Sequence, residues 1–319
     1  MRVTNPTARK LLAHPALFFG AGLVAALIIP GPAKPLKTYI LTPMIIVMFL
    51  STTEIRFKAL MDVKRYGAKV VGAILLNYGF VSTLALLLAW IVFKEGDLYA
   101  GFVMMAAMPT AIAVIPLTYL MKGNVEVAVV GVTLSYILAL GLGPALVHFL
   151  LGSQLEVWRI FETLILVILF PLLASRLLIH LDIDEKMGLG KDVMVNICFF
   201  MVMYIIIGVN FEAFFIDTGV LVIVGLICIA RSLGTGVTCL GICKFLNVKR
   251  SDTITYTFFS SFKNLGIVAA IALVLFGERA SIPAALGAPI EMTNYIVLAI
   301  LIGWLFPDGA KDEKDRKID

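Results

Sequence analysis

The sequence predicts an all-α protein that crosses a membrane many times. Of its 319 residues, 61% are hydrophobic and 15% are charged, whereas a soluble domain carries about 25% charged residues. The mean hydropathy is +1.00. No stretch is polar enough to form a soluble domain, so we expect a single membrane domain over residues 1–319.

Ten apolar stretches approach the length of about 20 residues that a helix needs to cross a bilayer. The expected spans, of which the first two are short, are residues 13–29, 38–50, 70–93, 99–121, 125–151, 158–181, 193–211, 219–243, 253–276 and 282–306. The first stretch follows Arg2, Arg9 and Lys10 but lacks a small-residue cleavage site. We interpret it as a retained span and not as a signal peptide.

The basic residues of the connecting segments test this count. If both termini are cytoplasmic, eighteen Lys and Arg residues fall on the cytoplasmic side and five on the other. This bias follows the positive-inside rule and supports ten spans in the cell membrane, with a cytoplasmic tail at 307–319. The charged segment 54–69 is expected to lie on the cytoplasmic surface, against lipid or in solvent. The net charge of +5 comes from these loops and does not indicate a nucleic-acid partner.

The loop 180–192 divides the chain into five spans before it and five after it. An odd number of spans in each half forces the halves into opposite orientations. We therefore expect two inverted repeats, at about 11–151 and about 158–306. Inverted repeats with helices broken near the middle of the membrane are typical of secondary transporters.

The fourth and ninth spans each carry residues that interrupt a helix. Pro109 and Pro116 lie seven residues apart in the fourth span, with Thr110 after the first of them, and they cannot both sit inside one unbroken helix. A simple proline kink is the alternative. The ninth span contains a polar run that ends at Gly266. If both helices break, their ends meet at mid-depth, where helix N-termini favour an anion and free carbonyls favour a cation.

The polar run supplies the first candidates for a binding site, because ionisable groups are costly in hydrocarbon. Lys263 lies far from either end of its span, next to Ser260, Ser261 and Asn264. A side chain that snorkels to the nearer interface is one interpretation. The others are a permanent internal cation that replaces a bound metal ion, or a proton carrier.

Three further polar residues lie inside expected spans. Arg231 in the eighth span and Glu291 in the tenth are the other intramembrane charges. Either could pair with Lys263 or line the same cavity, and Arg231 could also be purely structural. Asn77 in the third span is a candidate ligand, with a helix–helix hydrogen bond as the alternative.

Metal binding and enzyme chemistry find no support in the sequence. All four cysteines lie inside expected spans, and no His or carboxylate joins Cys239 and Cys243 on their shared helix face. No nucleotide-binding loop, HExxH motif or Ser-His-Asp arrangement appears. We therefore expect no metal, no cofactor and no enzymatic activity.

Two runs carry a resemblance to a known family. Residues 262–277 resemble the ninth helix of the bile acid:sodium symporter family, and residues 117–128 resemble its link from the fourth to the fifth helix. The family lies in the bile/arsenite/riboflavin transporter superfamily. The resemblance implies a panel domain and a core domain that move relative to each other. It also implies two discontinuous helices that cross in the core, where sodium-coupled members hold two Na⁺ ions.

The chain departs from this family at the sodium ligands. The matching positions carry Val114, Ile115, Ala128, Val132, Phe259 and Lys263. Only the third-helix amide remains, as Asn77. Hard cations need several oxygen ligands, so bound Na⁺ is disfavoured, and we expect the ammonium of Lys263 in its place.

These features predict a secondary transporter of a small organic anion, coupled to protons or uncoupled. Lys263, Arg231 and the half-helix ends would supply the positive potential. The alternatives are an efflux permease for arsenite or another inorganic anion, and a membrane sensor that keeps the fold without transport. Residues 289–291 resemble the arsenite-permease branch, but Met108 lies in the region where that branch carries a cysteine.

Overall fold

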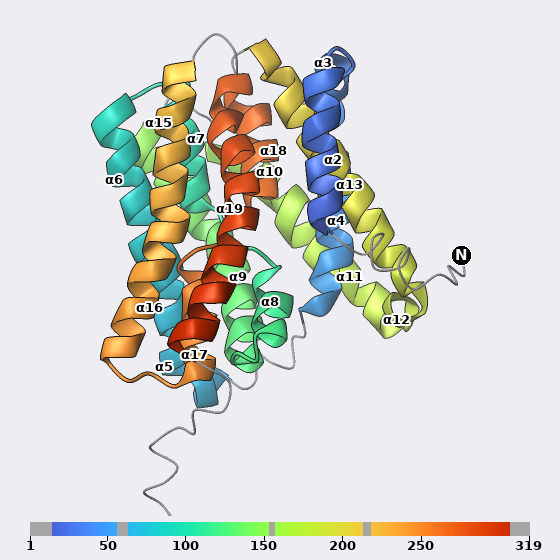
Figure 1. Ribbon diagram of the computed structural model, residues 1–319. Helices are drawn as coiled ribbons and strands as arrows, with labels where there is room; N and C mark the ends of the chain where they lie inside the picture. Colours follow the sequence, from blue (N-terminus) through green and yellow to red (C-terminus); the bar gives the residue numbers. More distant parts are fainter. Residues whose placement is uncertain (1–14, 56–62, 153–156, 213–217, 307–319) are drawn as a thin grey trace, which may run out of the picture.

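The computed structural model describes residues 15–55, 63–152, 157–212 and 218–306. In these ranges every regular element is a helix, and the long helices lie side by side in a bundle (Figure 1). The predicted all-α class is therefore confirmed for the described part of the chain. The expected tail 307–319 and part of the surface segment 54–69 lie outside the described residues.

The helices between Pro15 and Leu151 occur in the same order as the five spans expected for the first half of the chain. Their bounds are α2 (Pro15–Ile28), α3 (Ala33–Leu36), α4 (Leu41–Ser51), α5 (Val63–Ile74), α6 (Ser82–Phe93), α7 (Asp97–Ala107), α8 (Val114–Leu120) and α9 (Val125–Leu151). The π-helical segment η4 (Leu75–Val81) joins α5 to α6 without interrupting the rod. Short 3₁₀ turns, η1 (Lys37–Tyr39) and η2 (Thr52–Glu54), flank α4.

The second half contains a similar succession of elements. Their bounds are α10 (Val157–Leu164), α11 (Phe170–His180), α12 (Ile183–Met187), α13 (Leu189–Val209), α15 (Thr218–Ile229), α16 (Thr235–Phe245), α17 (Arg250–Phe259), α18 (Leu265–Phe276) and α19 (Glu278–Leu305). Two π-helical segments continue the rods, η5 (Ile165–Leu169) between α10 and α11 and η6 (Ala230–Gly234) between α15 and α16.

Six of the described helices are long and apolar enough to cross a membrane. They are Tyr66–Phe93, Val125–Leu151, Trp158–His180, Leu189–Val209, Thr218–Phe245 and Glu278–Leu305. The pair Ala33–Tyr39 and Leu41–Glu54, bent by 53°, makes a seventh if it is one span. This count is lower than the expected ten because α2 is short and the fourth and ninth segments are divided.

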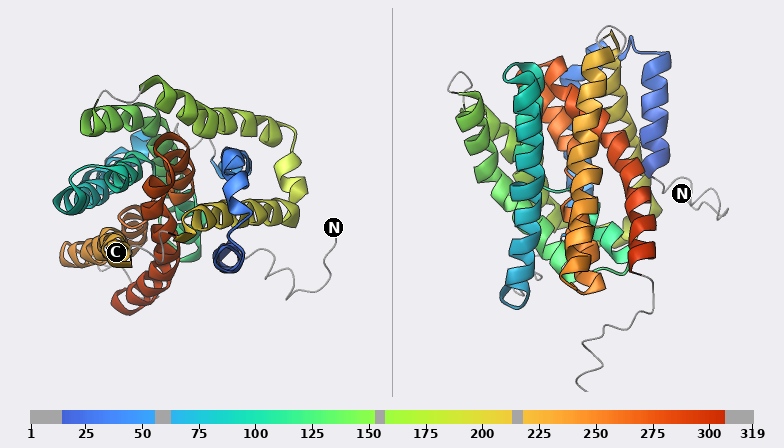
Figure 2. Two further views of the ribbon diagram at one scale, coloured as in Figure 1. Left: turned by 90° about the horizontal axis from the view of Figure 1, so that it is seen from above. Right: turned by 60° about the vertical axis from the view of Figure 1, so that its left-hand side comes forward.

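The helices form two groups, which Figure 2 shows from above. The first group comprises α2, α3, α4, α11, α12 and α13 with the turns next to them, including η1, η2 and residues 210–212, and its helices pack around α13 or against one another. The second group comprises α5 to α9 and α15 to α19, in which α7, α18 and α19 pack together at the centre. Residues of α13 also contact α18 and α19, so the groups share one interface.

Both interruptions lie in the second group. Residues 108–113 separate α7 from α8, and Met108 is extended (φ −80°, ψ 155°). Pro116 lies in the first turn of α8, where the missing N–H costs no helical hydrogen bond. Residues 260–264 separate α17 from α18, and the Asn264 side chain caps α18 by accepting the N–H of Ile267 at 3.2 Å.

Candidate substrate and ion site

The two interruptions contact each other directly. The backbone N–H of Asn264 donates to the carbonyl of Pro109 at 2.9 Å. The Thr110 hydroxyl donates to the carbonyl of Phe262, also at 2.9 Å. Backbone groups that a break releases must find partners inside the protein when water is absent. Each interruption therefore supplies partners for backbone groups of the other. The place where the two interrupted segments meet is termed the crossing.

Lys263 places its ammonium at this crossing. The residue is only 2% exposed. Its Nζ donates to the carbonyls of Met108 at 2.8 Å and Ala106 at 3.2 Å, at the end of α7. It also lies 4.5 Å from the centroid of the Tyr78 ring. Carbonyl oxygens at a helix C-terminus and an aromatic face both stabilise a cation. The site is thus built to hold a positive charge.

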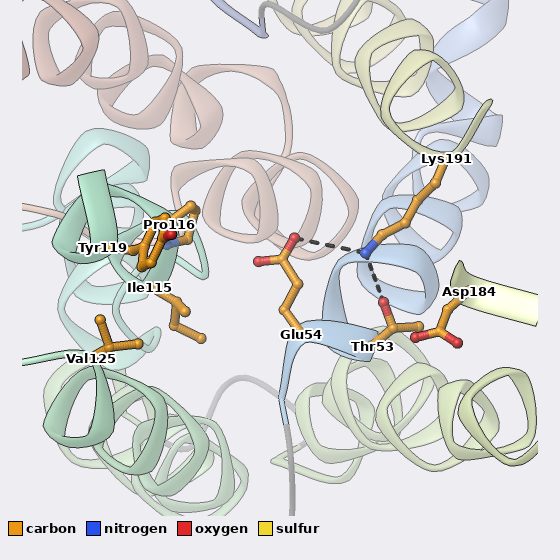
Figure 3. A pocket seen from close by; sticks show the side chains of 8 residues that line it. All are labelled: Thr53, Glu54, Ile115, Pro116, Tyr119, Val125, Asp184 and Lys191. Carbon is orange, nitrogen blue, oxygen red and sulfur yellow. Dashed lines mark hydrogen bonds and ion pairs between the residues drawn. The ribbon is translucent and has the colours of Figure 1, made fainter. Parts of the chain in front are cut away.

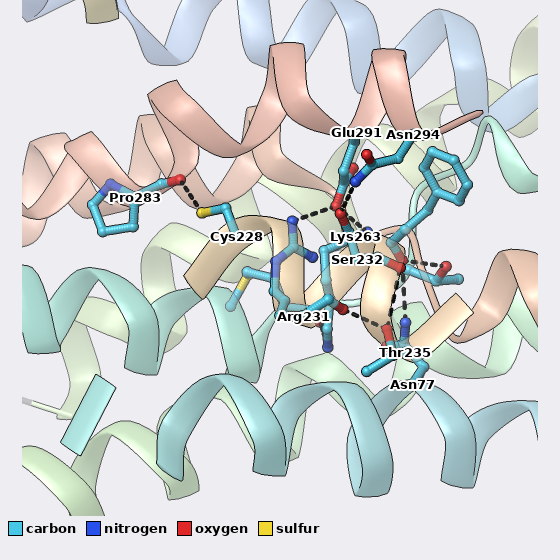
Figure 4. Close-up of polar contacts among 12 residues, drawn as sticks. Asn77, Cys228, Arg231, Ser232, Thr235, Lys263, Pro283, Glu291 and Asn294 are labelled. Carbon is cyan, nitrogen blue, oxygen red and sulfur yellow. Dashed lines mark hydrogen bonds and ion pairs between the residues drawn. The ribbon is translucent and has the colours of Figure 1, made fainter. Parts of the chain in front are cut away.

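An ion pair lies next to Lys263 (Figure 4). Nη2 of Arg231 donates to Oε1 of Glu291 at 2.6 Å, and the same oxygen accepts the backbone N–H of Lys263 at 3.1 Å. Arg231 is fully buried and Glu291 is 6% exposed. Nε and Nη1 of Arg231 have no hydrogen-bond partner among the described residues. With all three side chains ionised, their formal charges sum to +1.

Two π-helical segments position residues around the ninth-segment break. Asn77 lies in η4, and its Nδ2 donates to the carbonyls of Phe259 at 3.1 Å and Phe262 at 3.2 Å. Its Oδ1 has no partner among the described residues. Arg231 lies in η6. Such wide turns often occur at functional sites because they re-aim side chains.

The two serines of the polar run are turned toward their own helix. The hydroxyls of Ser260 and Ser261 donate to the carbonyl of Thr257 at 2.9 and 2.7 Å. In addition, the Thr235 hydroxyl in α16 donates to the carbonyl of Ser260. These contacts hold the end of α17 in place, and neither serine oxygen is among the acceptors of the Lys263 ammonium.

Two tyrosines complete the crossing and were not among the predicted site residues. Tyr78 supplies the ring under the Lys263 ammonium. Tyr136 in α9 is fully buried, and its hydroxyl accepts a hydrogen bond from the Asn264 amide. A phenol in the middle of a 27-residue apolar helix is the signal that could have identified Tyr136.

Gly266 lies in the first turn of α18 and not within the break. A Cβ added there would lie 3.2 Å from Sδ of Met44 in α4. This is tighter than ordinary van der Waals contact, so the glycine permits close packing between the two helix groups.

A cavity of about 360 Å³ lies between the two groups, at the end of the bundle that holds α8 and α12 (Figure 3). Its lining residues are Thr53, Glu54, Asp184 and Lys191 on the first group and Ile115, Pro116, Tyr119 and Val125 on the second. Nζ of Lys191 donates to the Thr53 hydroxyl at 2.8 Å and lies 3.7 Å from the Glu54 carboxylate. The volume is in the range of small-molecule sites.

The sequence model of one protein family, the SBF-like CPA transporter family, matches residues 17–289. The chain belongs to this family. The expected resemblance to bile acid:sodium symporters is thereby confirmed at the level of the family. No curated protein matches the chain. Membership, together with the long apolar helices, identifies a multi-pass membrane protein of a transporter family.

This SBF-like transporter does not offer a coordination shell for Na⁺ at the positions that the family resemblance indicates. Val114, Ala128 and Val132 are fully buried and apolar. The Phe259 ring packs on Gly131 of α9 so closely that a Cβ there would lie 2.7 Å from Cζ. A hard cation needs several oxygen ligands, and here an aromatic ring fills the space between α17 and α9. The side chains at these four positions therefore offer a cation no oxygen ligand.

Gly236→Ala in this SBF-like transporter is expected to destabilise the crossing. A Cβ at this position of α16 would lie 2.3 Å from Oγ of Ser261 and 3.1 Å from Leu298. Overpacking of this kind costs about 1–3 kcal/mol, so the melting temperature of the purified protein should fall. Gly241→Ala on the same helix is the control, because nothing lies within 4 Å of its Cβ. Equal melting temperatures for the two variants would contradict the packing argument.

Proposed function

We propose that this SBF-like transporter moves a small organic anion by alternating access and without bound Na⁺. The observation that carries the proposal is the Lys263 ammonium at the crossing of two interrupted helices. Its partners, the carbonyls of Ala106 and Met108, are the kind of oxygen that an alkali cation would take. The tethered ammonium replaces the ion, and coupling is to protons or absent.

The charges at the crossing favour an anion as the substrate. The Glu291 carboxylate pairs with Arg231 and accepts only the backbone N–H of Lys263, and two guanidinium nitrogens of Arg231 are without a partner among the described residues. An unbalanced charge inside a protein is unfavourable until it is paired. A carboxylate or similar group that binds near the crossing would balance it.

We further propose ten membrane spans in two inverted five-helix repeats, at about 11–151 and about 158–306. Two parallels between the halves support this assignment. The third rod of each half contains a π-helical segment, η4 or η6, and the fourth rod is interrupted, between α7 and α8 or between α17 and α18. Both termini are then cytoplasmic, as the distribution of basic residues indicates.

In this proposal the first helix group is the panel and the second is the core. At the end of the bundle near α3, Nζ of Lys37 lies 2.7 Å from Glu278, and Nδ2 of Asn210 donates to the Ser281 hydroxyl at 2.9 Å. Both contacts join the two groups. At the opposite end, near α12 (Figure 1), residues of both groups line the cavity. Contacts at one end and a cavity at the other support an inward-facing state of an alternating-access cycle.

The test cross-links the two groups at the closed end. We expect a Lys37→Cys/Glu278→Cys variant, joined by a short reducible thiol cross-linker, to lose uptake of radiolabelled taurocholate into proteoliposomes at least tenfold and to regain it on reduction. Both side chains are accessible to the reagent, at 47% and 40% exposure.

The matched control is Lys34→Cys/Glu212→Cys. This pair forms an exposed ion pair at 2.9 Å, but both residues belong to the first group. Cross-linking within one rigid group should leave uptake unchanged. Full activity of the cross-linked Lys37/Glu278 variant would rule out relative movement of the groups at this end. Wild-type uptake no greater than that of empty liposomes would contradict transport of this anion.

A further inference from the structure

Cys239 and Cys243 form a buried pair of free thiols in α16 that the proposed function does not use. The residues are 3% and 5% exposed, and their Sγ atoms lie 4.0 Å apart. Two sulfur ligands bonded to one ion at about 2.3 Å each lie about 3.8 Å apart in a tetrahedral arrangement and about 4.6 Å apart in a linear one. The observed separation lies between these values, so small side-chain rotations would let both sulfurs bind one ion.

The helix opposite the thiols presents oxygen atoms. The hydroxyls of Thr257 and Ser260 in α17 lie near Cys239, and that of Thr253 lies near Cys243. Thr257 and Ser260 donate their own protons to backbone carbonyls at 2.8 and 2.9 Å. These hydroxyl protons are therefore already engaged, and α17 gives the thiols polar neighbours that an apolar core would lack.

The number of available ligands decides the kind of ion. Among the described residues, no group of three or more His, Cys, Asp or Glu side chains could hold a metal. The nearby Asp252 carboxylate already accepts from Asn124 at 2.7 Å and pairs with Lys69 at 2.6 Å. A zinc site needs four ligands or three and a water, so this pair suits an ion that accepts two sulfurs.

Contrary to the expectation of no metal from the sequence, we infer that Cys239 and Cys243 bind one copper(I) ion through two Cu–S bonds, and that the bound ion stiffens the part of α16 that packs on α17. Soft thiolate ligands select copper(I). Each thiol releases its proton as its Cu–S bond forms, so binding frees two protons and requires neither an oxidant nor a reductant.

The thiols lie on the part of α16 that supports the crossing. One turn earlier, the Thr235 hydroxyl donates to the carbonyl of Ser260, and Gly236 packs on Ser261. An ion that bridges two turns of α16 fixes the helix face on which the interrupted end of α17 rests. Bound copper(I) is therefore expected to slow any movement of the crossing. This consequence rests on the proposed transport function.

The binding test uses purified wild-type protein titrated with copper(I) under anaerobic conditions, in competition with bicinchoninate. We expect one copper(I) per chain. Cys239→Ser and Cys243→Ser should each weaken binding at least tenfold, whereas Cys198→Ser and Cys228→Ser, which change the other two buried thiols, should not. Unchanged affinity in the first two variants, or no binding by the wild type, would overturn the site.

A second measurement keeps this test independent of how well the variants fold. In the wild-type protein loaded with one equivalent of copper(I), X-ray absorption at the copper edge should show two sulfur neighbours. A copper environment without sulfur neighbours would also overturn the site.

The transport test measures taurocholate uptake into proteoliposomes. One equivalent of copper(I) should slow uptake at least threefold in the wild type and leave Cys243→Ser unaffected. If copper(I) binds but does not change uptake, the site stands and the claim that bound copper hinders movement is wrong. Absence of taurocholate uptake in copper-free wild-type protein would contradict the proposed function and leave the binding result standing.

Discussion

Replacing Lys263 with glutamine is expected to lower the melting temperature of the purified protein by several degrees and to make its stability depend on Na⁺. The variant lacks the charge that the Ala106 and Met108 carbonyls hold in the wild type. Leaving a buried acceptor without its hydrogen-bond donor costs about 1–3 kcal/mol. The glutamine oxygen and the two carbonyls would together form an oxygen site of the kind that a hard cation binds.

The measurement compares melting curves in sodium chloride and in choline chloride at equal ionic strength. The wild-type curves should superimpose, whereas the Lys263→Gln protein should gain stability in sodium. Lys186→Gln, which changes an exposed lysine of α12, is the control for loss of one positive charge. If Na⁺ stabilises the wild type as strongly as it stabilises Lys263→Gln, the ammonium does not take the place of the ion.

Glu291→Gln should be at least as damaging, for a different reason. The amide keeps the shape of the side chain and can still accept the backbone N–H of Lys263, but it leaves Arg231 fully buried without a counter-charge. Loss of one member of a buried ion pair costs about 3–5 kcal/mol. We expect a large fall in melting temperature, measured in detergent, and loss of taurocholate uptake.

A double variant separates the structural role of the pair from its functional role. Replacing a buried ion pair by apolar residues of similar volume is often neutral for stability, so Arg231→Met/Glu291→Met should melt close to the wild type. Because it lacks the Arg231 charge, it should remain inactive in uptake. Wild-type uptake by this stable double variant would show that the pair serves packing alone. Glu126→Gln, at a carboxylate in the exposed first turn of α9, controls for the change in net charge.

Local chemistry made part of this architecture predictable. Proline cannot occupy a helix interior without loss of a hydrogen bond, and Pro109 and Pro116 accordingly lie in a break and in a first turn. Lys263 was predicted as a site residue because a charged side chain in the middle of a span is costly. Each of these predictions depends only on the residues of a single segment and not on how segments pack. The all-helical class likewise follows from composition alone.

The partners within the site could not be derived in this manner. Arg231 and Glu291 are 60 positions apart, and which acid meets which base depends on the rotation of two helices about their axes. The sequence left both residues as candidate partners of Lys263, whereas the Glu291 carboxylate meets the Arg231 side chain and only the backbone of Lys263. Tyr78 and Tyr136 depend on the same rotations. The helices α7, α8, α17 and α18 are each too short to count as a membrane span. The number of spans therefore cannot be read from helix length alone.

The covalent attachment of the Lys263 ammonium has a consequence for the energetics of transport. A cation that cannot leave its site cannot carry the energy of an ion gradient into the cycle. A monoanion that crosses without an accompanying proton moves its own charge, and a potential of 100 mV, negative inside, is worth about 2.3 kcal/mol. That corresponds to a concentration ratio of roughly fifty-fold in favour of the outside. Without protons, the membrane voltage would therefore act as the driving force and make this protein an exporter.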